Sequence, residues 1–151
     1  MRLQLNNSHL TSDGGLKVGD MLPNISKCVQ REQLVKYSEV SGDKNPIHLS
    51  DDFAKTTQFG GIIAHGMLTL AFVSELMTNV FESDWLTSGC LKVRFKGAAY
   101  LGDRLVVSGE VIEVESLGDI SNLTCSVSVK VCRNEQSVDI LNGTAKLTLG
   151  G

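Results

Sequence analysis

The 151-residue sequence has little of what marks special classes of protein. It contains two prolines and four cysteines, and 21% of its residues are charged, with a formal net charge of −3. Because this charge is small and negative, the chain has no electrostatic reason to bind nucleic acid along an extended face. With 42% apolar residues, the composition is typical of one globular domain and leaves no room for a nucleotide-binding domain plus a substrate domain.

The cysteines lack the spacing of common metal and redox motifs. They stand far apart in the sequence, at Cys28, Cys90, Cys125 and Cys132, with no CxxC pair and no Cys/His spacing that would close a tetrahedral zinc site. We therefore expect reduced, semi-buried thiols.

No uninterrupted apolar stretch is long enough for a membrane span. The most apolar segment, residues 61–81, contains His65, Ser74 and Glu75, whereas a span needs about 20 nearly uninterrupted apolar residues. The first ten residues have neither the apolar stretch of a secretory signal nor the arginines of a transit peptide. These observations predict a cytoplasmic protein that does not bind membranes, with the apolar segment as a core helix.

The order of hydrophobic patterns predicts helices first and strands afterwards. Residues 1–16 are mostly polar and show no periodic apolar pattern that could form a buried face. We therefore expect a flexible arm there and a single domain over 17–151. Helical spacing predicts a short helix over 31–40, and a segment apolar on nearly every side predicts an enclosed helix over 63–81. Alternating apolar and polar residues then predict strands over 91–95, 105–114, 123–131 and 141–149.

These patterns together favour an α+β domain, in which an antiparallel sheet packs on one long helix. The apolar face of the sheet and the helix each need the other as a partner for burial. A sheet of about five strands leaves part of such a helix bare. We therefore expect a second copy to cover the remainder, in a homodimer.

The densest group of reactive side chains lies in one predicted loop, at Asp43, Asn45 and His48. Pro46 fixes its own φ and biases Asn45 toward extended backbone, so the loop can bring carboxylate and imidazole together. A carboxylate beside an imidazole that titrates near neutrality is suited to proton transfer. The alternative is an Asx turn, in which Asp43 and Asn45 bond the backbone and His48 only lies nearby.

A second group, Gly60 to Gly66, ends where the long helix is expected to begin. The first N–H groups of a helix lack internal partners and lie at the positive end of its dipole, so the N–H of Gly66 can bind an oxyanion. The alternative is an ordinary loop glycine, with His65 capping or packing. Asp43, His48 and His65 also resemble a facial triad of metal ligands, but their loops offer no further ligands, so we expect no metal.

The string from Tyr37 to Ala54 resembles the signature of the (R)-specific enoyl-CoA hydratases, also called the MaoC-like dehydratase family. In that signature an aromatic residue precedes Gly-Asp-x-Asn-Pro-aliphatic-His and then a small residue, as it does here. The likeness continues through residues 64–68, which match a His-Gly-Met segment, and through 91–105. One departure is Ala98, where the family usually has proline.

The resemblance implies a hot-dog fold, with an antiparallel sheet wrapped around one long central helix, and dimers formed through sheet edges. It implies that Asp43 and His48 hold and activate one water molecule, and that the N–H of Gly66 holds the oxyanion. Asn45 and Ser74 match positions that orient this pair in similar enzymes.

The implied activity is reversible syn hydration of a trans-2-enoyl-CoA to the (R)-3-hydroxyacyl-CoA, without a cofactor, since coenzyme A is part of the substrate. An acyl-carrier-protein thioester is the other possible substrate. Two alternatives stay open: a hot-dog acyl-CoA thioesterase, whose water attacks the thioester carbonyl, and a non-catalytic acyl-CoA-binding subunit.

Basic residues alternate with apolar ones at Lys92, Arg94 and Lys96. Such a stripe suits the phosphates of coenzyme A. It is also the pattern of any half-exposed strand, so we assign no phosphate ligand to it.

Overall fold

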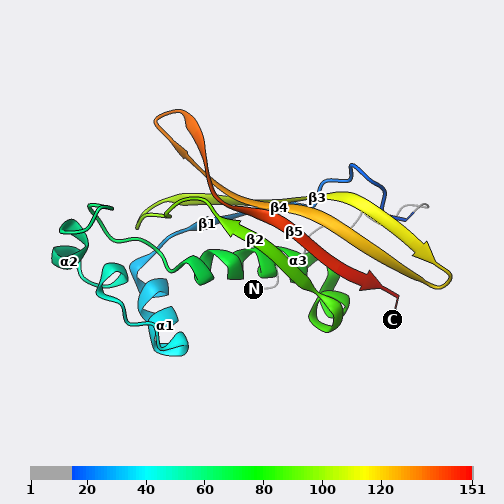
Figure 1. Ribbon diagram of the computed structural model, residues 1–151, viewed down its shortest axis with the longest axis horizontal. Helices are drawn as coiled ribbons and strands as arrows, with labels where there is room; N and C mark the ends of the chain where they lie inside the picture. Colours follow the sequence, from blue (N-terminus) through cyan, green and yellow to red (C-terminus); the bar gives the residue numbers. More distant parts are fainter. Residues whose placement is uncertain (1–14, 151) are drawn as a thin grey trace, which may run out of the picture.

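The computed structural model describes residues 15–150, which form one antiparallel sheet with a long helix on one face (Figure 1). The α+β architecture predicted from the sequence is therefore confirmed. Of the arm predicted over residues 1–16, residues 1–14 lie outside the described part of the chain.

The helices precede most of the sheet in the sequence. They are α1 (Arg31–Ser41), the short 3-10 helix η1 (Pro46–His48), α2 (Asp51–Lys55) and α3 (Gly66–Ser88). Figure 1 shows α1 and α2 at one end of the sheet, whereas α3 runs along its face. The loop with the candidate acid and base therefore lies at the end where α3 begins.

The sheet has the strand order β1-β3-β4-β5-β2, and each pair of neighbours is antiparallel. Its strands are β1 (Ile25–Cys28), β2 (Cys90–Phe95), β3 (Arg104–Leu117), β4 (Ile120–Arg133) and β5 (Gln136–Leu149). The alternation in the sequence predicted the last four strands but not β1, whose four residues are too few for a clear period. β1 and β2 are the two edges of the sheet.

The helix α3 begins and ends later than the predicted range of 63–81. It cannot begin at Ile63, because Ile63 pairs with Tyr100 in a β-bridge, and the N–H of Ala64 donates to the carbonyl of Ala99. It continues past Phe81 through Glu82, whose φ of 48° interrupts the helical path. The final turn brings Trp85 back against the core.

The core lies between α3 and the inner face of the sheet, and the outer face is largely polar. Along β4, Leu123, Cys125, Val127, Val129 and Val131 are buried, and the intervening residues from Ser126 onward are less so. α3 is enclosed on the sheet side, but Met67 remains 55% exposed. This exposure agrees with the expectation that one sheet leaves part of the helix bare within a single chain.

The four cysteines are free, as expected, but they are not all semi-buried. Cys125 lies in the core, where burial raises the pKa of its thiol to about 11, whereas Cys90 and Cys132 are exposed. Among the described helices, none combines the length and the hydropathy that crossing a membrane would require.

Candidate active site

The loop after α1 holds its acid and its asparagine in two consecutive Asx turns. The chain leaves α1 through Gly42, whose φ of 79° is in the left-handed region that favours glycine. Asp43 Oδ1 then accepts the N–H of Asn45 at 3.2 Å, and Asn45 Oδ1 accepts the N–H of Ile47 at 3.1 Å. Pro46 begins η1, in the position where its missing N–H costs nothing. The turn expected as the alternative is therefore present.

The same turns bring Asp43 and His48 together. Asp43 Oδ2 lies 4.0 Å from His48 Nε2, with the carboxylate half-exposed and the imidazole largely buried. On the other side of the ring, Nδ1 lies 2.7 Å from the carbonyl oxygen of Ile63. Because a carbonyl can only accept, Nδ1 carries the hydrogen, and neutral His48 therefore presents a lone pair at Nε2 toward Asp43.

The carbonyl of Ile63 is held in place by a network that sequence reasoning did not identify. Residues 62–64 pair with residues 99–101 through two backbone hydrogen bonds, which form the bridge between Ile63 and Tyr100. Arg133 fixes that second segment, because its guanidinium donates to the carbonyl of Ala98 and to the carboxylate of Asp103. Ala98 is the position where proline was expected, and here its carbonyl is the acceptor. Every residue has a backbone carbonyl, so the sequence does not show which carbonyl will orient His48.

His65 packs directly beneath the pair. It is 2% exposed, and its ring stacks on that of His48 with centroids 3.8 Å apart and planes at 26°. Its Nε2 lies 3.1 Å from the carbonyl oxygen of Asp43 and 3.1 Å from Ser38 Oγ. Tyr37 contacts the ring at a centroid distance of 4.7 Å. The sequence pattern indicated a capping or packing role for His65, with a metal ligand as the less favoured alternative, and it did not identify Ser38.

The environment of His65 favours its neutral form. Burial lowers the pKa of His65, and the neighbouring His48 adds to that effect, while the bond to Asp43 opposes it. His65 is also the N-cap of α3, where the positive end of the helix dipole disfavours an imidazolium. We conclude that His65 is a neutral donor through Nε2–H.

A pocket of about 280 Å³ opens beside this cluster, between the start of α3 and the edge strand β2. Asp43, His65 and Gly66 line it together with apolar side chains, including Met67 and Phe95. Gly66 is the first residue of α3, so its N–H has no acceptor within the helix. A Cβ at Gly66 would lie 3.2 Å from the ring of Phe95, so glycine leaves this approach open.

The three side chains considered as metal ligands lie close together, with their donor atoms within 4.8 Å of one another. Their hydrogen bonds suit a metal poorly. Nδ1 of His48 carries the hydrogen donated to Ile63, and Nε2 of His65 carries the hydrogen donated to Asp43. The arrangement is better suited to proton transfer between Asp43, His48 and a bound molecule.

Ser74, which the resemblance assigns to orienting the pair, makes its side-chain hydrogen bond elsewhere on α3 in this chain. It lies eight residues after Gly66 on α3, which places it about 12 Å further along the helix axis. Its hydroxyl accepts the indole N–H of Trp85 at 3.1 Å. Through this hydrogen bond, Ser74 holds Trp85 and the last turn of α3 against the middle of the same helix.

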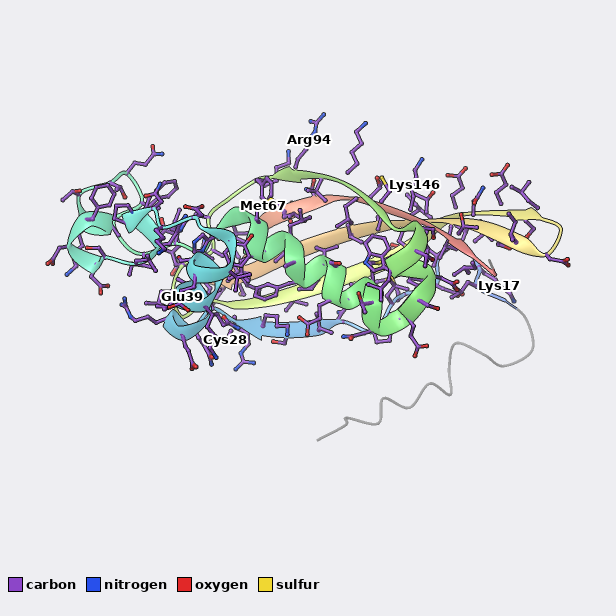
Figure 2. The ribbon with its side chains drawn as sticks, turned by 90° about the horizontal axis from the view of Figure 1, so that it is seen from below. Lys17, Cys28, Glu39, Met67, Arg94 and Lys146 are labelled. Atoms are coloured by element: carbon purple, nitrogen blue, oxygen red, sulfur yellow. The ribbon has the colours of Figure 1, made fainter. Side chains whose placement is uncertain are left out.

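The basic residues of β2 point away from the candidate site. Lys92 and Arg94 pair with Thr144 and Asn142 of β5, and so share the outer face of the sheet with them. Figure 2 shows Arg94 directed away from α3. This placement fits the solvated face that was one of the two expectations, and it does not bring these side chains into the pocket.

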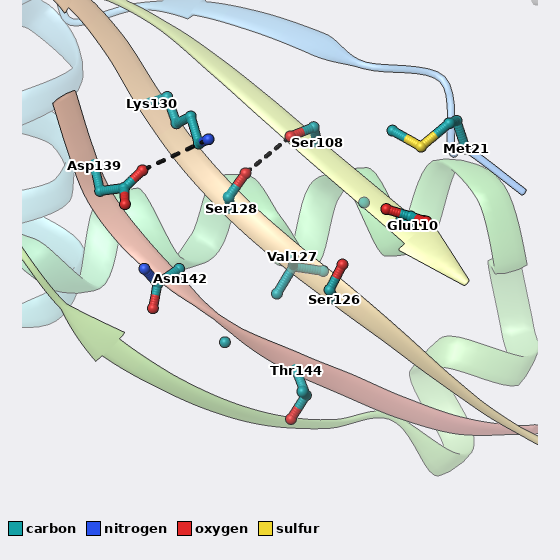
Figure 3. A pocket seen from close by; sticks show the side chains of 12 residues that line it. Met21, Ser108, Glu110, Ser126, Val127, Ser128, Lys130, Asp139, Asn142 and Thr144 are labelled. Carbon is teal, nitrogen blue, oxygen red and sulfur yellow. Dashed lines mark hydrogen bonds and ion pairs between the residues drawn. The ribbon is translucent and has the colours of Figure 1, made fainter. Parts of the chain in front are cut away.

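A larger hollow, of about 440 Å³, lies on that outer face over β3, β4 and β5 (Figure 3). Its side chains are mostly polar, and two pairs interact: Ser108 and Ser128 hydrogen-bond at 2.9 Å, and Lys130 lies 3.8 Å from Asp139. An antiparallel sheet commonly keeps one such wet face. The hollow contains none of the acid, base and oxyanion groups described above.

Comparison with known proteins relates the chain to enzymes that act on thioesters. Residues 18–132 match the model of the MaoC like domain. The chain is 31% identical over 105 residues to a 3-hydroxybutyryl-CoA dehydratase of Methylorubrum extorquens, covering 70% of this chain and 67% of the relative. It is 29% identical over 112 residues to an (R)-specific enoyl-CoA hydratase of Rhodospirillum rubrum, covering 72% and 76%.

Solved structures confirm the fold. An R-hydratase from Pseudomonas aeruginosa superposes with a TM-score of 0.69 at 28% identity, over 89% of this chain and 85% of that one. An (R)-hydratase from A. caviae superposes with a TM-score of 0.67 at 24% identity, over 88% and 96%. The sheet and the central helix therefore form the hot-dog fold expected from the resemblance.

Proposed function

Because the chain belongs to the MaoC-like dehydratase family, we propose that it catalyses the reversible syn hydration of a trans-2-enoyl thioester to the (R)-3-hydroxyacyl thioester. The observation that carries this proposal is the placement of His48. Its Nδ1–H is fixed on the carbonyl of Ile63, and its Nε2 lone pair faces Asp43 Oδ2 across 4.0 Å. A water molecule bonded to both groups at about 2.8 Å each spans that distance.

In the proposed hydration, His48 acts as base and then as acid. Nε2 takes one proton from the water as the water oxygen bonds to C3. The C2=C3 electron pair then forms the C1=C2 bond of an enolate, and the carbonyl π pair moves onto the thioester oxygen. Nε2–H then gives that proton to C2 on the same face, which restores the neutral imidazole. Asp43 accepts the remaining hydrogen of the water and stabilises the imidazolium. Dehydration is the same path in reverse.

The enolate oxygen formed in this path needs a donor, and we assign that role to the N–H of Gly66. The amide stands at the start of α3 in the pocket that Asp43 also lines. A donor that is already positioned costs no reorganisation as charge develops. The reaction requires no prosthetic group, because coenzyme A, or the pantetheine arm of an acyl carrier protein, belongs to the substrate.

The direct test is to add purified protein to crotonyl-CoA. We expect the absorbance of the conjugated enoyl thioester to fall while the thioester stays intact, with (R)-3-hydroxybutyryl-CoA as product. Release of free coenzyme A would instead assign the chain to the thioesterases. Tight binding of acyl-CoA without either change would assign it to the non-catalytic subunits.

The roles of the pair are tested by Asp43→Asn and His48→Ala. Each removes most of the turnover while the variant stays folded by circular dichroism, because general acid–base groups contribute about a hundred to ten thousand-fold. The matched control is Asp52→Asn, which changes an exposed carboxylate on α2. A variant of Asp43 or His48 with turnover near that of the control contradicts the role assigned to that residue.

A further inference from the structure

His65 is the one buried titratable side chain at the site that the proposed reaction does not use. Its Nδ1 is buried and has no hydrogen-bond partner among the described residues. A buried nitrogen without a partner is costly, so its retention beside the candidate acid and base requires a reason. A purely packing role would be filled as well by an apolar ring.

Two contacts connect His65 to the reacting groups. Through Nε2–H it donates to the backbone carbonyl of Asp43 and so holds the loop that carries the carboxylate. Through its ring face it supports His48, whose centroid lies 3.8 Å away. Loss of either contact would change the separation between the carboxylate and Nε2 of His48.

The charge state of His65 matters for the same reason. In the proposed reaction His48 becomes an imidazolium for part of each cycle. A cationic ring stacked 3.8 Å from it would raise the energy of that state, whereas a neutral ring does not. The titratable groups that face His65 are His48 on η1, Asp43 on the loop and Tyr37 on α1.

We propose that His65 is a positioning residue, which as a neutral Nε2–H imidazole fixes the distance between Asp43 and His48 and allows His48 to accept a proton. The inference rests on the proposed function for its effect on turnover. Its effect on the structure of the loop is independent of the reaction.

The test separates the two contacts of His65. His65→Phe keeps a flat ring against His48 and removes the donor, while His65→Gln removes the ring and keeps an N–H donor. We expect His65→Phe to lower kcat for crotonyl-CoA hydration by about ten to a hundredfold with little change in KM, because misplaced reacting groups cost turnover more than binding. His65→Gln should recover part of that loss.

The control is Val129→Ala, which truncates a fully buried side chain on β4, remote in sequence from the loop. It lowers the melting temperature without touching either contact of His65. A fall in kcat for Val129→Ala as large as that for His65→Phe, or normal kcat in His65→Phe, would overturn the proposal. If His65→Phe does not fold, a normal kcat in His65→Gln would also overturn it, because Gln lacks the ring that supports His48.

Amide hydrogen exchange tests the loop without any activity. The N–H groups of Asn45, Ile47 and His48 are bonded within the loop. We expect them to exchange faster in His65→Phe, relative to core amides of the same variant, but not in Val129→Ala. The chain has three histidines, so ¹⁵N-histidine spectra can also report the tautomer directly.

An Nδ1–H tautomer for His65, or unchanged loop exchange in His65→Phe, would refute the positioning role even if the wild-type protein hydrates enoyl-CoA. Conversely, absence of hydration by the wild-type protein would refute the proposed function. Accelerated loop exchange and the Nε2–H tautomer would still support the structural part of the inference in that case.

Discussion

His65 gives the folded chain a defined dependence on pH. Its pKa lies below the ordinary value of 6.5, because the side chain is buried. The unfolded chain therefore binds a proton at this residue at a higher pH than the folded chain does. The stability associated with neutral His65 is fully present above pH 6.5 and is lost as the pH falls toward the pKa of the folded state.

This dependence can be measured by urea unfolding between pH 8 and pH 5. We expect the unfolding midpoint of the wild-type protein to fall below pH 6.5, and the midpoint of His65→Phe to change less over the same interval. The comparison is made within each variant, so the loss of stability from the substitution itself cancels. Parallel curves for the two proteins would show that His65 does not titrate differently in the two states.

A second residue-scale prediction concerns Ser74. Its hydroxyl is the acceptor for the indole N–H of Trp85, so Ser74→Ala leaves a buried donor without a partner. We expect the free energy of unfolding to fall by about 1 kcal/mol. Tryptophan fluorescence reports the same event, because Trp85 is the only tryptophan in the sequence. An unchanged unfolding curve would mean that Trp85 finds another acceptor, such as water.

Much of the candidate site could be predicted from residue types, and the rest depended on tertiary contacts. Asp43 and His48 share one short loop, so their proximity followed from local turn chemistry. The orientation of His48 did not, because it depends on the carbonyl of Ile63, fifteen residues later, and backbone carbonyls leave no mark in a sequence. The bond between Ser74 and Trp85 did not follow either, because sequence position on a helix does not reveal which side chain a hydroxyl contacts.

At the scale of the elements, the start of α3 is the feature on which the proposed oxyanion site depends. The amide of Gly66 is free because it belongs to the first turn, and proline is well tolerated in that position. His65 has φ and ψ of −56° and 132°, which is the extended backbone that a residue before proline prefers. A proline at position 66 would therefore remove the N–H and still allow α3 to begin at the same residue.

We predict that Gly66→Pro lowers kcat by about a hundred to a thousandfold relative to Gly66→Ala. Both variants add a Cβ that lies against Phe95, and only the first removes the donor. Comparing the two separates the hydrogen bond from the added bulk. Equal turnover in the two variants would exclude the Gly66 N–H as the oxyanion donor.

A second feature at this scale is Arg133 at the end of β4. It binds the segment 98–103, which pairs with the segment that contains Ile63. Arg133 is part-buried, pairs with Asp103 and lies 4.9 Å from the ring centroid of Tyr100. Replacing it with methionine leaves the carboxylate of Asp103 largely buried without its cation.

We expect Arg133→Met to lower the free energy of unfolding by about 2 kcal/mol, between the values for surface and buried pairs. Chemical denaturation measures this difference. The control is Arg104→Met, which changes an exposed arginine whose side chain makes a long hydrogen bond, of 3.4 Å, to Ser26 Oγ. We expect it to change stability by less than about 0.5 kcal/mol. Equal effects of the two substitutions would mean that Arg133 does not fix this connection.

At the scale of the whole molecule, the two faces of the sheet differ in what they leave uncovered. The outer face is largely polar, and two pairs of its side chains interact there, Ser108 with Ser128 and Lys130 with Asp139 (Figure 3). On the other side, Met67 of α3 is 55% exposed and lies beside Phe95, at 51%, on β2, which pairs with β5 and is an edge strand of the described sheet. Edge strands in native proteins are usually covered or otherwise protected. The dimer predicted from the sequence is therefore best placed at this edge.

Light scattering tests this placement with two methionines of similar exposure. Met67 lies beside β2, and Met21, at 59% exposed, lies over the outer face. We expect the wild-type protein and Met21→Lys to have twice the mass of one chain, and Met67→Lys to shift toward that of a single chain, because a lysine would bury its charge in the interface. A wild-type protein with the mass of one chain would contradict the dimer. A dimer that withstands Met67→Lys but not Met21→Lys would place the interface on the outer face of the sheet, where the candidate site could not contact the second copy.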